Sequence, residues 1–381
     1  MRVGGVSLVA LVCLAGAASA APDKEPASND SPARSEPAGR EAAPALTREA
    51  IDAATFTEDA TSKDAGTAGS KQDRAEKDAA KGADDKRPDP LLVKVQVLLD
   101  RAHFSPGAID GRDGENLRGA LSAFAVANGL PAANSLNAKL FDTLKATSAE
   151  PVVTDYTLTE ADVAGPYVSR IPPKMEDQAD LDALGYTDAR EMLAERFHMA
   201  PALLTALNPG KALDKAGTVI AVAAVPPLET GKPSAEDRKR MDKDVARVTV
   251  DKETRHVRAF DKAGKLVAFY PASIGSEEKP APSGHATVKG VAFAPTYTYN
   301  PKYAFKGVKA KEKFEIEPGP NNPVGIAWID LSIPSYGIHG TPEPEKVGKT
   351  ESHGCIRLTN WDVRDLASRI EPGAKVTFAD D

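Results

Sequence analysis

The spacing of apolar residues changes along this chain, and the change limits the folds that it can adopt. Between Pro90 and Lys145, leucines recur at intervals of three and four residues, which is typical of amphipathic helices. From Val245 onward, short segments such as 256–260 alternate between apolar and polar residues, as strands do. A length of 381 residues allows two or three domains. We therefore predict a multidomain protein in which small helical and α+β modules precede a β-rich domain, a mixed sandwich or barrel with one short helix.

The first twenty residues have the pattern of a secretory signal. A positive charge at Arg2 precedes the apolar run 6–14, which is too short to span a bilayer, and the small-residue pattern at 18–20 predicts cleavage before Ala21. The protein is thus expected to be exported to the periplasm or cell envelope. Residues 21–88 are rich in small and charged residues and almost lack aromatic ones, which predicts a disordered linker.

Two modules and a second linker follow. We assign residues 89–147 to a bundle of three short helices with a glycine-containing turn at 106–111, and residues 153–226 to a small α+β unit. Residues 227–244 are charged and contain proline and glycine, so they form a predicted linker before the β-rich domain at 245–381. By pattern alone, the helical bundle could be a structural spacer.

Cysteine usage points to a reactive thiol. Removal of the signal takes Cys13 away, so the mature protein keeps Cys355 alone and cannot form an internal disulfide. His353 and His339 lie two and sixteen residues before Cys355. A nearby imidazole can take the proton of a thiol or stabilise the thiolate. The spacing makes a Cys/His pair chemically sensible without proving it, and a buried inert thiol remains the alternative.

Neighbouring residues suit acyl transfer. Gly354 allows close approach of a substrate to the backbone, and the amides of Gly354 and Cys355 could face a developing oxyanion. Arg357 could hold a substrate carboxylate or form a surface ion pair. A zinc site made of His339, His353 and Cys355 is the competing reading, but the mature chain has no second cysteine, so we predict neither metal nor cofactor. A net charge of -7 argues against a nucleic-acid partner.

The C-terminal region resembles the catalytic domain of the L,D-transpeptidase (YkuD-type) family. Five elements follow in the family order: Ala281–Gly284, Tyr299–Pro301, Gly319–Gly325, Ile338–Thr341 and Ser352–Leu358. Ala281 replaces the threonine that is usual there, and His285 stands where the family often has threonine. Residues 89–147 resemble a peptidoglycan-binding domain, and residues 153–226 resemble a LysM module, although the stretch after the first strand is longer than is usual in that family.

The resemblance implies a role for each matching residue. Cys355 would be the acylated nucleophile, and His339 the general base, oriented by the backbone carbonyl of Gly340. His353 would shape the thiolate pocket, and the amides of Gly354 and Cys355 would form the oxyanion hole. Four further residues would contact substrate: Arg357, Ser352, Tyr336 and Asn322.

The implied reaction is acyl transfer on peptidoglycan. Cys355 would attack the bond after the L-centre of meso-diaminopimelate in a tetrapeptide stem, and an amine of a second stem would resolve the thioester into a 3→3 crosslink. Water as acceptor would give an L,D-carboxypeptidase, and an outer-membrane or wall protein as acceptor would give an anchoring enzyme. Carbapenems are expected to acylate Cys355. Two other readings are a non-catalytic peptidoglycan-binding protein and a papain-like hydrolase, although in the latter group the cysteine generally precedes the histidine.

Overall fold

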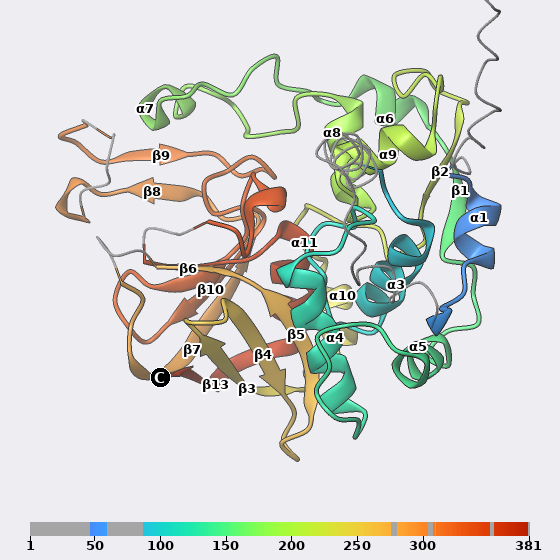
Figure 1. Ribbon diagram of the computed structural model, residues 1–381. Helices are drawn as coiled ribbons and strands as arrows, with labels where there is room; N and C mark the ends of the chain where they lie inside the picture. Colours follow the sequence, from blue (N-terminus) through green and yellow to red (C-terminus); the bar gives the residue numbers. More distant parts are fainter. Residues whose placement is uncertain are drawn as a thin grey trace, which may run out of the picture. The chain divides into compact units, whose positions relative to one another are not determined.

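The computed structural model describes residues 46–58, 87–275, 280–303, 308, 310–350 and 354–379 (Figure 1). The predicted signal sequence and most of the first predicted linker lie outside these residues. Within the described part, no helix is both long enough and apolar enough to cross a membrane.

A nine-stranded mixed sheet forms the β-rich domain. Its strands are β3 (Val245–Asp251), β4 (His256–Phe260), β5 (Leu266–Pro271), β6 (Ser273–Ile274), β7 (Gly284–Phe293), β10 (Ala327–Leu331), β11 (Gly337–His339), β12 (Ile356–Arg357) and β13 (Ile370–Ala379). They lie in the order β5-β4-β3-β13-β7-β10-β11-β12-β6. The two edge strands, β5 and β6, are separated in sequence by Ala272 alone, so the sheet must curl until its edges approach. The predicted β-rich domain is thereby confirmed, as a nearly closed mixed sheet.

Helix α11 (Asn360–Arg369) covers the sheet from one side. Its N-cap is Thr359, whose hydroxyl accepts a hydrogen bond from the amide of Asp362 at 3.1 Å, as a capping side chain should. Val363 and Leu366 lie one helical turn apart and are fully buried in the same core as the sheet. The helix places the buried side chain of Asn360 beside strands β10 and β11.

The segments before the sheet contain the three helices that the apolar spacing predicts, α3 (Pro90–Arg101), α4 (Glu115–Ala127) and α5 (Ala138–Lys145). Further elements follow: β1 (Val153–Thr157), α6 (Glu160–Ala164), α7 (Met175–Gln178), α8 (Ala189–Arg196), α9 (Pro201–Leu207) and β2 (Val219–Ala223). A short helix, α10 (Ala235–Arg240), lies within the predicted second linker. β1 and β2 pair antiparallel. Residues from 93 to 225 share one continuous hydrophobic core, so the two predicted modules are packed together rather than built around separate cores. Their resemblance to glycan-binding modules stays a prediction.

One prediction for the first linker is wrong. Residues Arg48–Ala53 form helix α1, which Thr47 caps by accepting a hydrogen bond from the amide of Ala50 at 3.1 Å. Ile51 is fully buried in the core of the helical segments. Lys94 donates to the carbonyls of Asp52 and Ala54 at 2.6 and 2.9 Å, which fixes the end of this helix. The composition of this segment did not predict that Ile51 would pack into the core of the helical segments.

The helical part also completes one edge of the sheet. The amide of Ser105 donates to the carbonyl of Phe269 at 2.8 Å, and the amide of Phe269 donates to the carbonyl of His103 at 2.9 Å. Residues 103–105 therefore lie along β5 as a short extra strand, and α4 packs against the same strand (Figure 1). Pairing satisfies backbone groups that an open edge would expose. Phe269 itself points into the helical core, where it is fully buried.

Candidate active site

His339 lies on β11, and Cys355 immediately precedes β12, the parallel strand beside it. β11 and β12 pair with Ile338 opposite Ile356 and His339 opposite Arg357. Both isoleucines are fully buried in the sheet core, so the alternation of side chains turns His339 and Arg357 to the other face. Cys355 lies immediately before β12 and two residues before Arg357, which puts it on the side of the sheet that His339 faces.

The imidazole of His339 is fixed in one orientation. Its Nδ1 lies 2.7 Å from the carbonyl oxygen of Gly340, so Nδ1 must carry the proton and donate. Nε2 is then left with a lone pair. Burial and, to a smaller extent, the positive charge of Arg357 lower the pKa of His339 to about 3, against the opposite effect of the Gly340 hydrogen bond. His339 is therefore a neutral imidazole near pH 7, the state that can accept a proton.

Trp328 supports this imidazole from β10. The two residues are paired in the antiparallel register of β10 and β11, and their rings stack at 5.4 Å with planes 16° apart. Gly337 makes room for the indole, because a Cβ there would lie within 3.0 Å of the Trp328 ring. Trp328 was not among the predicted site residues, although it is one of two tryptophans in the chain.

The thiol of Cys355 is partly buried and has a backbone acceptor. Its Sγ lies 3.7 Å from the carbonyl oxygen of Ser335, in the turn between β10 and β11. Ser335 and Gly354 have φ values of 68° and 108°, in the left-handed region that serine rarely adopts. Two unusual backbone conformations thus shape the surroundings of one thiol, which is a common feature of functional sites.

Tyr297 is a second residue that the sequence reading missed. It belongs to the hairpin of β8 (Tyr297–Tyr299) and β9 (Phe314–Ile316). Burial and, to a smaller extent, the charge of Cys355 raise the pKa of Tyr297 to about 12. The phenol stays protonated at neutral pH and can donate a hydrogen bond. The sequence signal was its position two residues before Tyr299, the first residue of the Tyr299–Pro301 element.

The guanidinium of Arg357 has an N–H group that is available to a ligand. Burial lowers the pKa of its guanidinium, while Glu343 and Cys355 raise it, so both acidic groups lie near. Its Nε is buried and has no hydrogen-bond partner among the described residues. An unsatisfied charged donor beside a nucleophile suits the predicted contact with a substrate carboxylate. Tyr336 is half-buried just before β11, and its contact with substrate stays a prediction.

Asn322 has a structural role in its own loop, and its contact with substrate stays a prediction. Its side chain is fully buried, and its Nδ2 donates to the carbonyls of Ile316 and Glu317 at 3.3 and 2.9 Å. Its Oδ1 accepts from the amide of Val324 at 2.9 Å. These bonds use the amide to hold a loop together.

Some predicted site residues cannot be placed. Ser352 and His353 lie outside the described residues, so their roles stay predictions, as does an oxyanion hole at Gly354 and Cys355. Among the described residues, no group of three histidine, cysteine or acidic side chains is arranged to hold a metal. The zinc alternative included His353 and stays untested.

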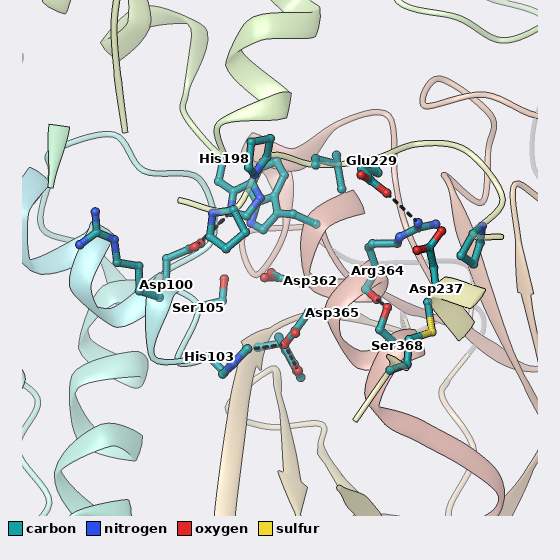
Figure 2. Close-up of a pocket in the computed structure, with 18 of the residues that line it drawn as sticks. Asp100, His103, Ser105, His198, Glu229, Asp237, Asp362, Arg364, Asp365 and Ser368 are labelled. Carbon is teal, nitrogen blue, oxygen red and sulfur yellow. Dashed lines mark hydrogen bonds and ion pairs between the residues drawn. The ribbon is translucent and has the colours of Figure 1, made fainter. Parts of the chain in front are cut away.

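A cavity of about 420 Å³ lies away from these residues. Figure 2 shows it between His198, Glu229 and Arg364, with His103 and Asp365 on another side. None of the predicted catalytic or substrate-binding residues lines it. This cavity therefore has no part in the predicted chemistry.

Comparison with known proteins identifies the domain that carries Cys355. Residues 246–377 match the YkuD family model, described as an L,D-transpeptidase catalytic domain. The chain is 30% identical over 132 residues to the L,D-transpeptidase YkuD of Bacillus licheniformis, covering 35% of this chain and 64% of that protein, which is less than two thirds of its length. It is 34% identical over 139 residues to the L,D-transpeptidase YqjB of Bacillus subtilis, covering 35% of this chain and 71% of that protein.

Among solved structures, L,D-transpeptidase 3 from Mycobacterium tuberculosis in complex with a faropenem-derived adduct matches 43% of this chain and 75% of its own, at 13% identity and a TM-score of 0.30. The sequence matches extend over the strands that hold His339 and Cys355. The chain belongs to the L,D-transpeptidase family.

Proposed function

We propose that this protein is an exported L,D-transpeptidase that acts on peptidoglycan stem peptides through a thioester on Cys355. The observation that carries the proposal is His339: a neutral imidazole, held by Gly340 through Nδ1, on the strand beside the one that Cys355 precedes. A neutral imidazole beside a cysteine can take the thiol proton and so generate the thiolate. Family membership supplies the reaction class.

The first half-reaction forms the acyl-enzyme. Nε2 of His339 takes the thiol proton, and Sγ of Cys355 attacks the carbonyl carbon that joins the L-centre of meso-diaminopimelate to D-alanine. A C–S bond forms, the C–N bond breaks, and the leaving D-alanine amine takes the proton from His339. Arg357 holds a carboxylate of the donor stem, and the amides of Gly354 and Cys355 stabilise the oxyanion.

The second half-reaction transfers the acyl group. An amine of another stem, deprotonated by His339, attacks the thioester, and the C–S bond breaks to give an amide and the free thiol. This product is a 3→3 crosslink. Export to the periplasm would bring the enzyme to this substrate, and the two N-terminal segments would hold it on the glycan.

Intact-mass spectrometry with meropenem tests the nucleophile. We expect an adduct of one meropenem on the full mature chain and none on the Cys355→Ala variant. Absence of an adduct on folded, reduced wild type would count against an acylatable Cys355 and favour a peptidoglycan-binding protein. A folded Cys355→Ala variant that is still acylated would remove Cys355 from the mechanism.

Tetrapeptide-containing muropeptides then identify the acceptor. Release of D-alanine together with a crosslinked dimer supports the transpeptidase. Release of D-alanine with tripeptide alone means that water is the acceptor and that the enzyme is an L,D-carboxypeptidase. Cleavage inside the stem without release of D-alanine contradicts both reactions.

A further inference from the structure

Glu195 is an unusual residue for its surroundings. It lies on α8, before the residues that match the catalytic domain, and its side chain is buried, with 5% of its surface exposed. Among the described residues, no basic side chain forms an ion pair with it. A buried carboxyl group without a cation is costly unless hydrogen bonds satisfy it. The hydrogen bond that Glu195 makes is therefore informative.

That bond connects α8 to α11. Nδ2 of Asn360 donates to Oε1 of Glu195 at 2.5 Å and to the carbonyl of Pro320 at 3.1 Å. Oδ1 of Asn360 accepts from the amide of Ile326 at 3.2 Å. Asn360 is fully buried, so Glu195 and two backbone groups hold its amide in a single orientation.

The Asn360 amide packs between two glycines next to the catalytic strands. A Cβ at Gly325 or Gly340 would lie well within 3.0 Å of Oδ1 of Asn360, so the amide lies against both backbones. Gly340 also donates from its amide to the carbonyl of Val324 at 3.1 Å. The position of Gly340 is thus set by contacts on two sides.

Gly340 is the residue whose carbonyl orients the base. Its oxygen lies 2.7 Å from Nδ1 of His339, which fixes both the tautomer and the direction of Nε2. The contacts run from Glu195 to Asn360, from Asn360 to Gly340, and from Gly340 to His339. Each group is buried, so a displaced amide has little room to adjust.

We infer that Glu195, a residue outside the catalytic domain, is a positioning residue for His339 and acts through Asn360 and Gly340. The inference deepens the proposed function and rests on it for its kinetic readout. The accessory segment would then be part of the catalytic apparatus, besides any contact that it makes with the cell wall.

Glu191 provides a matched control. It lies one helical turn before Glu195 on the same face of α8, and its Oε1 accepts from Nδ2 of Asn321 at 2.8 Å. This bond also ties α8 to the catalytic domain, but it does not reach Asn360 or Gly340. If Glu195 merely attached one segment to the other, loss of Glu191 should have the same effect.

Glutamine is a close mimic of Glu195. Burial raises the pKa of Glu195 to about 8, although Asn360 lowers it, so the side chain is mostly protonated and uncharged at pH 7. The charge of Glu191 on the same helix also raises the pKa of Glu195. Three further charged residues line the cavity of about 260 Å³ that Glu195 also lines: Glu343, Glu345 and Lys346. A neutral amide that offers a carbonyl oxygen to Asn360 should preserve the contact.

The test compares Glu195→Gln, Glu195→Met and Glu191→Met in the full mature chain at pH 7. The first measurement is the rate constant of acylation by saturating meropenem, with the concentration for half-saturation. We expect wild-type behaviour from Glu195→Gln and Glu191→Met. For Glu195→Met we expect a rate constant lowered at least tenfold, ~1.4 kcal/mol, with little change in half-saturation. Should Glu195→Met fail to fold, Glu195→Asp takes its place, because its shorter side chain does not reach Asn360.

The second measurement separates the inference from the proposed function. The ¹⁵N shifts of His339 report which ring nitrogen carries the proton, whether or not the enzyme is acylated. Loss of the single Nδ1–H tautomer in Glu195→Met, and not in Glu191→Met, supports the positioning role of Glu195. This conclusion holds even if wild type gives no meropenem adduct. A missing adduct would contradict the proposed function but not the positioning role. An unchanged tautomer with an unchanged acylation rate overturns the inference, and so does an equal loss in both methionine variants.

Discussion

Replacing Gly340 by alanine should damage the base while leaving its side chain intact. A Cβ at this position would lie well within 3.0 Å of Oδ1 of Asn360, and 3.2 Å from both Cα of Gly325 and Cγ1 of Val363. The Gly340 backbone or the Asn360 amide must move by roughly 1 Å to restore normal contact distances. A shift of that size would stretch the 2.7 Å bond between Nδ1 of His339 and Gly340 beyond hydrogen-bonding range.

The magnitude follows from these contacts. Overpacking of a full core costs about 1–3 kcal/mol, and loss of the histidine hydrogen bond costs about 1 kcal/mol more. A misdirected general base forfeits a part of the ~10²–10⁴-fold that such catalysis supplies, so acylation should slow about 100-fold. Gly290→Ala is the control: that glycine also lies in the sheet, and a Cβ there meets no atom within 4 Å.

Urea unfolding gives the stability of both variants, and intact-mass spectrometry gives the rate of meropenem acylation. We expect Gly290→Ala to stay within about 0.5 kcal/mol of wild type and to acylate normally. A Gly340→Ala protein that unfolds at the wild-type midpoint and acylates at the wild-type rate would refute the reasoning, because Asn360 would then not be packed against Gly340 as described.

Three further predictions follow from burial and charge. Because the pKa of His339 is lowered to about 3, the acylation rate should show no inflection near pH 6.5. Stopped-flow measurements between pH 5 and 8 test this, and an inflection near pH 6.5 would contradict it. The pKa of His256 is lowered to about 4, chiefly by burial. His256 therefore binds a proton near pH 6.5 in the unfolded chain but only near pH 4 in the folded chain. The free energy of unfolding should therefore fall as pH drops from about 6.5 to 4, with a smaller fall in His256→Gln, as urea titrations can measure. Phe269→Ala should lower the free energy of unfolding by about 3–5 kcal/mol, because Phe269 is fully buried. Phe260→Ala should lower it much less, because Phe260 is half-buried, with the Arg247 guanidinium 3.6 Å from its ring centroid. Equal losses of unfolding free energy in the two variants would contradict this.

Local patterns in the sequence predicted local structure well. The leucine spacing predicted three short helices between Pro90 and Lys145, where α3, α4 and α5 lie. Such features depend on residues a few positions apart, whose geometry is the same in any protein. The five ordered elements around Cys355 likewise identified the family, because the order of motifs is a property of the chain itself.

Residues whose role depends on distant contacts were harder to assign. Asn322 lies in a recognisable motif, but its amide is consumed by backbone groups that only the folded loop brings together. Trp328 and Tyr297 had no distinctive spacing from Cys355, since they approach the site from other strands.

The sequence by itself determined the order of the segments, their helices and strands, and the chemistry available at Cys355 and His339. The tertiary structure decided that residues 103–105 complete the edge at β5, that Ile51 enters a distant core, and that Glu195 meets Asn360 across 165 positions of chain. Because hydrophobic burial is not directional, the apolar pattern specifies which faces of the helices and strands are buried. It does not specify which other elements cover those faces. Hydrogen bonds between remote residues are selected only after that packing has brought the partners within reach.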